Sequence, residues 1–188
     1  MPLRHHGDGG LASLFDGTRI PKTDVRFSAL GDVDELASMV GLTLTWLAGT
    51  REHERLVWVQ ERLFRMGADL ANPGRRARGD EIAGADLEVL DAWLLEYRAA
   101  LPPLQHFVMP GGTPAAAGVH LCRAVCRRAE RSVFAVRALH PVHEPVPVFL
   151  NRLSDVLFEM ARFINTQSNV ADTEWLGPRD RKPSGPAA

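Results

Sequence analysis

The chain has 188 residues, of which 45% are hydrophobic and 24% are charged, a composition typical of a globular domain and not of a disordered chain. Its 22 basic and 23 acidic residues nearly cancel to a net charge of −1, which disfavours a general electrostatic nucleic-acid binder. No apolar run is long enough to cross a membrane. From the charge balance and this missing run together, we expect neither a nucleic-acid nor a membrane partner.

Residues 1–24 are rich in glycine and proline and lack an apolar period, which favours a loop or a flexible arm. Its polar opening, MPLRHHGDGG, does not resemble a secretory signal. Cys122 and Cys126 are one helical turn apart, too far for a disulfide, and are interpreted as small core residues in a reducing compartment. We therefore expect a cytoplasmic protein.

Apolar residues that recur every three or four positions predict five helices along the rest of the chain. The expected helical segments are 32–48, 56–70, 87–101, 113–139 and 145–166. The charged, glycine-rich stretch 73–84 is expected to be an exposed loop. No segment alternates convincingly between apolar and polar residues, so we expect no sheet. The predicted fold class is all-α, an antiparallel five-helix bundle with ferritin-like up-and-down packing.

The fourth predicted helix has two faces. Its apolar face is expected to bury Leu121, Val125, Ala129 and Val136, and its polar face groups His120, Arg123, Arg127, Glu130 and Arg131, with Arg128 beside them. Crowded arginines favour an anionic partner, because the guanidinium fork suits carboxylates and phosphates. A solvated face with local Glu–Arg pairs is the alternative that this pattern leaves open.

The fifth predicted helix also carries a second row, made of Asn151, Asp155, Phe158, Arg162 and Asn165. This row faces either solvent or a second contact surface, and its aromatic member favours the contact surface. In the arm, the Gly7-Asp8-Gly9-Gly10 run and Lys22 suit a phosphate, although the run is not a P-loop. His5-His6 is interpreted as an exposed pair, with a metal site as the less common alternative.

Three segments, taken together, resemble the ATP:cob(I)alamin adenosyltransferases of the propanediol-utilisation type. They are GTRIPKTDVRFSALGDVDEL (17–36), FVMPGGTPAAAGVHLCRAVCRRAER (107–131) and FLNRLSDVLFEMARFIN (149–165), in the same order over about residues 4–175. The resemblance implies a homotrimer of five-helix bundles with active sites between subunits. It also implies a nucleotide-binding arm at 1–24, a bundle domain at 25–168 and a flexible tail at 169–188.

The same resemblance implies roles for individual residues. The ATP site would comprise Gly7, Ser13, Lys22, Arg127, Arg128, Glu130, Arg131 and Asn151. Asp34 matches an acid that pairs across the subunit interface with the residue matched by Arg123. Phe107 matches the aromatic packed beneath the corrin, and Phe158 matches another aromatic that faces it. Mg²⁺ is the implied cofactor, with no ligands assigned, and an adenosylcobalamin-dependent enzyme is the implied client.

The implied reaction transfers the 5′-deoxyadenosyl group of ATP to cob(I)alamin and releases triphosphate. Phe107 at the lower axial position would exclude water and the cobalamin's own base, which makes Co(II) easier to reduce. The arm departs from the family pattern at Arg4, His5 and His6, and at Ala12 the family carries a hydroxyl. The second hypothesis is therefore a non-catalytic homologue that binds, delivers or senses a cobalamin or related tetrapyrrole.

Overall fold

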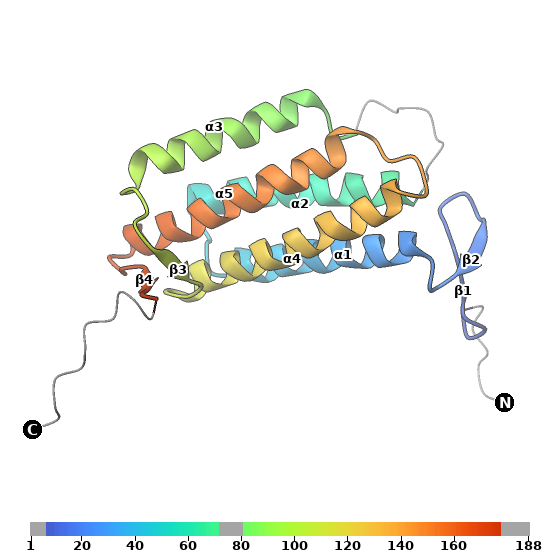
Figure 1. Cartoon of the computed structure of the whole chain (residues 1–188), viewed down its shortest axis with the longest axis horizontal. Helices are drawn as coiled ribbons and strands as arrows, with labels where there is room; N and C mark the ends of the chain where they lie inside the picture. Colours follow the sequence, from blue (N-terminus) through green and yellow to red (C-terminus); the bar gives the residue numbers. More distant parts are fainter. Residues whose placement is uncertain (1–6, 72–80, 178–188) are drawn as a thin grey trace, which may run out of the picture.

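The computed structural model describes residues 7–71 and 81–177. Within these ranges the chain forms a bundle of long helices (Figure 1). They are α1 (Val25–Leu44), α2 (Arg51–Leu70), α3 (Gly84–Ala100), α4 (Pro114–Arg137) and α5 (Pro145–Gln167). The predicted five helices and the mainly helical class are confirmed. None of the described helices has the length and apolar character needed to span a membrane.

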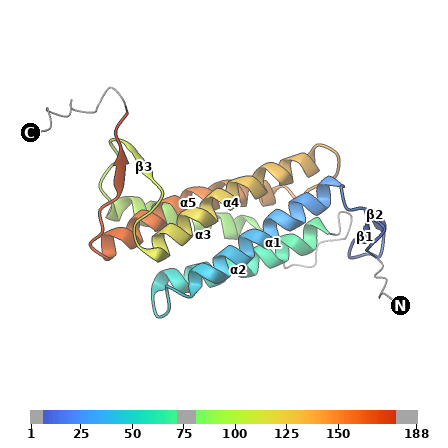
Figure 2. The same cartoon turned by 90° about the horizontal axis from the view of Figure 1, so that it is seen from below.

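Helix α4 lies at the centre of the packing, with α1 on one side and α5 on the other (Figure 2). Helix α2 packs on α1, and α3 packs on α5. One continuous core joins them, and its largest fully buried members include Leu36, Leu63, Tyr97 and Phe149. The regularly spaced apolar residues from which the second and fifth helices were predicted are buried, which fixes the rotation of both helices. They are Leu56, Val59, Leu63, Met66 and Leu70 on α2, and Leu150, Leu153, Leu157, Met160 and Ile164 on α5.

Capping residues explain where two helices begin. Helix α1 starts at Val25, earlier than the predicted residue 32, because the Asp24 carboxylate accepts a hydrogen bond from the backbone N of Arg26 at 3.0 Å. Arg26 also donates from its Nε to the same carboxylate at 2.9 Å. The predicted Thr113 cap of α4 is confirmed, since its hydroxyl accepts from the backbone N of Ala116 at 3.1 Å.

The expectation of no sheet is wrong. Strands β1 (Leu11–Ser13) and β2 (Arg19–Pro21) form one antiparallel pair, and β3 (Phe107–Met109) and β4 (Thr173–Trp175) form another. Three-residue strands are too short to show a two-residue alternation, which is why the sequence pattern missed them. The β1–β2 pair lies at one end of the bundle, and the β3–β4 pair lies at the other (Figure 1).

The predicted apolar face of α4 is wrong at one position. Leu121 is 49% exposed, whereas His120, expected on the polar face, is only 3% exposed. The core stripe instead runs through Cys122, Cys126, Ala129 and Val133, which follow a regular four–three–four spacing. Both cysteines are free and buried as predicted, and burial raises the pKa of Cys122 to about 11.

Candidate active site

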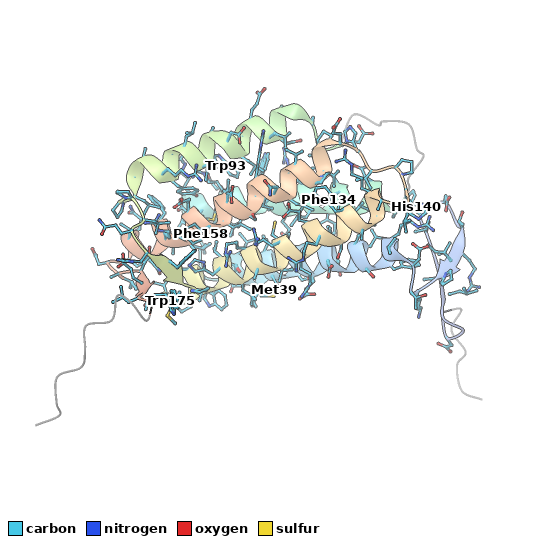
Figure 3. The ribbon with its side chains drawn as sticks, in the orientation of Figure 1. Met39, Trp93, Phe134, His140, Phe158 and Trp175 are labelled. Carbon is cyan, nitrogen blue, oxygen red and sulfur yellow. The ribbon has the colours of Figure 1, made fainter. Side chains whose placement is uncertain are left out.

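A cavity of about 570 Å³ opens beside the β3–β4 strand pair. Its wall combines residues 104–108, which lead into and begin β3, with one side chain each from α4, α5 and β4. The lining residues are Leu104, Gln105, His106, Phe107, Val108, Arg123, Phe158, Trp175 and Gly177. Figure 3 shows Phe158 on α5 and Trp175 on β4 in the same half of the molecule.

The rim of this cavity presents aromatic rings to solvent. Phe107 is 80% exposed, and Trp175 is its direct partner in the register of β3 and β4. Exposed large apolar side chains at the mouth of a cavity mark a ligand or partner surface. The two rings suit a broad ligand with an apolar face. Phe107 and Phe158, predicted to face a corrin, therefore do line one cavity.

Phe158 forms the back of the cavity, with two guanidinium groups and one imidazole around its ring. The Cζ atoms of Arg123 and Arg162 lie 5.9 and 6.0 Å from the ring centroid, and the His120 ring lies at 6.0 Å. Burial lowers the pKa of His120, and Arg123 lowers it further. Neither ring nitrogen of His120 has a hydrogen-bond partner among the described residues. Burial and the neighbouring guanidinium therefore both disfavour a positive charge on His120 beside the ring.

Arg123 differs from the other arginine beside Phe158. Its buried Nε has no hydrogen-bond partner within the described part of the chain, and burial lowers its pKa. Arg162, in contrast, donates to Asp172, to Glu159 and to the Pro102 carbonyl. Arg123 is thus a cation of the cavity lining that has no carboxylate partner in the described part of the chain.

The polar row predicted on the fifth helix is corrected at two positions. Arg162 and Asn165 are buried, so they face neither solvent nor a second surface. Their hydrogen bonds instead hold the segments around the cavity, because buried polar groups need partners. Asn165 accepts from the backbone N of Thr113 at 3.0 Å and donates to the Gly111 carbonyl at 3.2 Å. Asn151 and Asp155 are exposed, as the pattern predicts.

The remaining arginines of α4 point in two directions. Arg128 turns toward α1, where its Nε donates to Asp32 at 2.9 Å and its terminal nitrogen contacts Glu35. The hydrogen bond from Arg128 lowers the pKa of Glu35. Arg127 and Arg131 are exposed, and neither guanidinium forms an ion pair with any described residue. Arg131 also donates from its Nη1 to the Arg127 backbone carbonyl at 2.9 Å, which neutralises neither charge, so both guanidiniums keep donors for an anion.

Glu130 lies within one helical turn of Arg127 and Arg131 on α4 and contacts α5. Its carboxylate accepts a hydrogen bond from the Asn151 amide at 3.0 Å. Four of the predicted ATP-site residues, Arg127, Glu130, Arg131 and Asn151, are therefore close neighbours on the surface shared by α4 and α5. Arg128 is adjacent in sequence, but its guanidinium is occupied by the carboxylates of α1.

The arm residues lie at the other end of the molecule. A side chain added at Gly7 would come within 3.1 Å of the Lys22 Nζ, so these two residues are together as predicted. Ser13 is exposed on β1 opposite Arg19, and Ala12 pairs with Ile20. The departures from the family pattern at Arg4, His5 and His6 lie outside the described residues. The β1–β2 pair of the arm and strand β3, which carries Phe107, thus lie at opposite ends of the bundle (Figure 1).

Asp34 is exposed on α1 and makes no hydrogen bond or ion pair with the described residues of its own chain. Its predicted pairing with Arg123 across an interface stays a prediction. The described residues also contain no group of three or more His, Cys, Asp or Glu side chains able to hold a metal ion. A protein-only metal cage is therefore absent from that part of the chain.

Comparison with known proteins decides the family. The family model for cobalamin adenosyltransferase matches residues 3–164. The cobalamin adenosyltransferase of Cupriavidus metallidurans is 41% identical over 175 residues, which is 93% of each chain. The human corrinoid adenosyltransferase MMAB is also 41% identical, over 84% of this chain and 66% of that protein. This chain belongs to the cobalamin adenosyltransferase family.

Solved structures agree with this membership. A phenylalanine-to-alanine variant of the PduO-type ATP:corrinoid adenosyltransferase from Lactobacillus reuteri, complexed with cobalamin and ATP, has a TM-score of 0.85 and 30% identity. The match covers 92% of this chain and 97% of that one. The chain is thus an enzyme of the adenosyltransferase class, in a family whose members include one with both cobalamin and ATP bound.

Two residues at or behind the cavity, Trp175 and Asp172, had no signal in the sequence. Trp175 falls in the segment 169–188 that was expected to be a flexible tail, but its described part includes strand β4. Only the pairing of β4 with β3 brings Trp175 to the cavity. Residues 178–188 lie outside the described part of the chain. Asp172, in the same segment, is likewise unassigned by any local pattern.

Proposed function

We propose that the protein transfers the 5′-deoxyadenosyl group of ATP to cob(I)alamin, giving adenosylcobalamin and triphosphate. The observation that carries this proposal is the cavity whose rim presents the exposed Phe107 ring, in a chain of the cobalamin adenosyltransferase family. Adenosylcobalamin-dependent enzymes are the class that would use the product, so we propose such an enzyme as client.

The reaction is a displacement at carbon. The Co(I) electron pair of the substrate forms the Co–C5′ bond, the C5′–O bond breaks, and its electrons leave with the triphosphate. No general base is needed, because the nucleophile carries no proton. Phe107 contributes by covering the lower face of the corrin, which keeps water and the cobalamin's own base from the cobalt. Co(II) without an axial donor is then easier to reduce to the reactive state.

Triphosphate recognition is assigned to cations on two parts of the fold. Arg127 and Arg131 are exposed and lack ion-pair partners among the described residues, and Lys22 lies beside the glycine-rich turn of the arm. Such groups stabilise a polyanion as charge accumulates on the leaving group. Mg²⁺ bound mainly by phosphate oxygens and water needs few protein ligands. It would therefore enter with the nucleotide.

We propose that the site is shared between subunits of a homotrimer. The β1–β2 arm and strand β3, which lines the cavity, lie at opposite ends of one chain (Figure 1), so one chain alone cannot bring both to a single ATP and corrin pair. In a closed trimer the threefold axis would bring the arm of one subunit near this cavity of its neighbour. Asp34 and Arg123 form no ion pair with the described residues of their own chain, and they are the proposed contact across that interface.

Complementation between two defective variants tests the shared site. Lys22→Ala and Phe107→Ala would be co-expressed with different affinity tags, and complexes that carry both tags purified. If the site is shared, some interfaces contain an intact arm from one chain and an intact cavity from the other. We therefore expect the mixed complexes to form adenosylcobalamin faster than either variant alone.

Two controls make this result interpretable. Wild-type protein must form adenosylcobalamin from ATP and chemically reduced cobalamin, or the proposed reaction is wrong. Cobalamin binding without turnover would instead support the carrier hypothesis. If wild type turns over but the mixed complexes match the mean of the two variants, the arm and the cavity act within one chain. Sedimentation of the same samples reports whether the complex is a trimer.

A further inference from the structure

Asp172 fastens the C-terminal segment to the bundle just before β4. Its Oδ2 accepts a hydrogen bond from the Arg162 Nε at 3.0 Å, and its Oδ1 accepts from the Asn165 amide at 3.2 Å. The Asp172 side chain is 17% exposed, and both partners on α5 are buried. Shielded, charge-assisted hydrogen bonds of this kind are strong and directional.

The same two partners also hold both ends of the segment that carries Phe107. Arg162 donates from a second nitrogen to the Pro102 carbonyl at 3.0 Å, where this segment leaves α3. Asn165 binds the Gly111 carbonyl and the backbone N of Thr113, where the segment enters α4. One carboxylate therefore connects β4 to both ends of the loop that presents β3.

Pairing of β3 with β4 completes this connection. Phe107 and Trp175 are direct register partners, so a shift of β4 moves the two cavity rings relative to each other. Three residue pairs are a short ladder, and an isolated two-stranded ribbon is marginal in water. The ladder therefore depends on its anchors, and Asp172 is the anchor nearest β4.

We propose that Asp172 is a positioning residue for the corrinoid cavity, a role that rests on the proposed function. Its carboxylate holds β4 against β3 and so sets the position of Phe107 beneath the corrin. Asp172 does not line the cavity, and it acts through Arg162, Asn165 and the strand pair. Loss of its two acceptor oxygens should loosen the cavity without touching the nucleotide site on α4.

The fold should survive removal of this charge. Arg162 keeps a second carboxylate, because it also donates to Glu159 at 2.8 Å, and it keeps the Pro102 carbonyl. Asn165 keeps its bonds to Gly111 and Thr113. In Asp172→Asn the amide has a single oxygen, so it can accept from Arg162 or from Asn165 but not from both. The expected result is a folded protein with a loosened anchor.

Asp172→Asn would be compared with Glu174→Gln, a matched carboxylate-to-amide change at an exposed position on β4. We expect the KM for cobalamin to rise roughly ten- to a hundredfold in Asp172→Asn, the range for a lost charge-assisted hydrogen bond. The KM for ATP should stay at the wild-type value. The electron paramagnetic resonance signal of four-coordinate Co(II) should weaken, because a displaced Phe107 admits an axial ligand.

Hydrogen exchange on the free protein gives a readout that does not depend on activity. The amides of residues 107–109 and 173–175 should exchange faster in Asp172→Asn than in Glu174→Gln, while those of α4 should be unchanged. Equal exchange, equal cobalamin KM and an equal four-coordinate signal in the two variants would overturn the proposal. If wild type makes no adenosylcobalamin, the proposed function fails, while the exchange result still decides whether Asp172 anchors the strands.

Discussion

Gly112 should not tolerate a side chain, and alanine is the smallest change that tests this. Its φ of +100° lies where L-residues are rarely found. A Cβ built at this position would lie 2.1 Å from the Oδ1 of Asn165 and 2.4 Å from its Nδ2. Neither atom belongs to a freely moving chain end, because Asn165 is buried and hydrogen-bonded.

The cost of Gly112→Ala follows from these contacts. Holding alanine in a sparsely populated backbone region costs about 1–3 kcal/mol. Displacement of Asn165 removes its bonds to Thr113 and Gly111, each worth about 0.5–1.5 kcal/mol. The free energy of unfolding should therefore fall by about 2–6 kcal/mol, a large share of the stability of a typical domain.

Urea unfolding of Gly112→Ala, with Gly111→Ala as the matched control, measures this loss. A Cβ at Gly111 meets no atom within 4 Å, and its φ is not positive, so the control should remain close to wild type. The folded fraction of Gly112→Ala should also bind cobalamin more weakly, because Gly112 ends the segment that presents Phe107. Equal unfolding free energies for the two variants would refute the steric argument.

Three further predictions concern the cavity and α4. Arg127→Ala and Arg131→Ala should each raise the KM for ATP roughly ten- to a hundredfold, and Arg137→Ala serves as a control. Unchanged ATP kinetics in both variants would mean that the arginine face of α4 is only solvated. Phe107→Ala should keep the wild-type KM for ATP but lose the four-coordinate Co(II) resonance signal, and a signal of wild-type intensity would remove Phe107 as the axial blocker. The free energy of unfolding should fall as the pH drops below about 6.5, because the unfolded chain gains a proton at His120 that the folded chain, with its lowered pKa, resists. His120→Leu should flatten this slope in urea titrations at pH 5 and pH 7, and an identical slope would show that His120 is not its source.

Periodicity in the sequence was sufficient for the long helices. The stripes of α2 and α5 repeat over many turns, so each helix has one face that can be buried, and that face was predicted correctly. The resemblance of three sequence segments to one family also pointed to Phe107, Phe158 and the arginines of α4. These features depend on spacing along one helix or on a local motif.

The tertiary structure alone decided how distant segments meet. The strands are too short to leave an alternating pattern in the sequence. Leu121 has the larger apolar side chain, yet the packing of α1 and α5 against α4 buries Cys122 and leaves Leu121 half exposed. Asp172 and Trp175 lie in a segment without periodicity. Their positions are set by contacts with other elements: Asp172 accepts hydrogen bonds from α5, and Trp175 pairs with Phe107 on β3. Long-range pairing is set by the free energy of the whole fold, which a single local stretch does not encode.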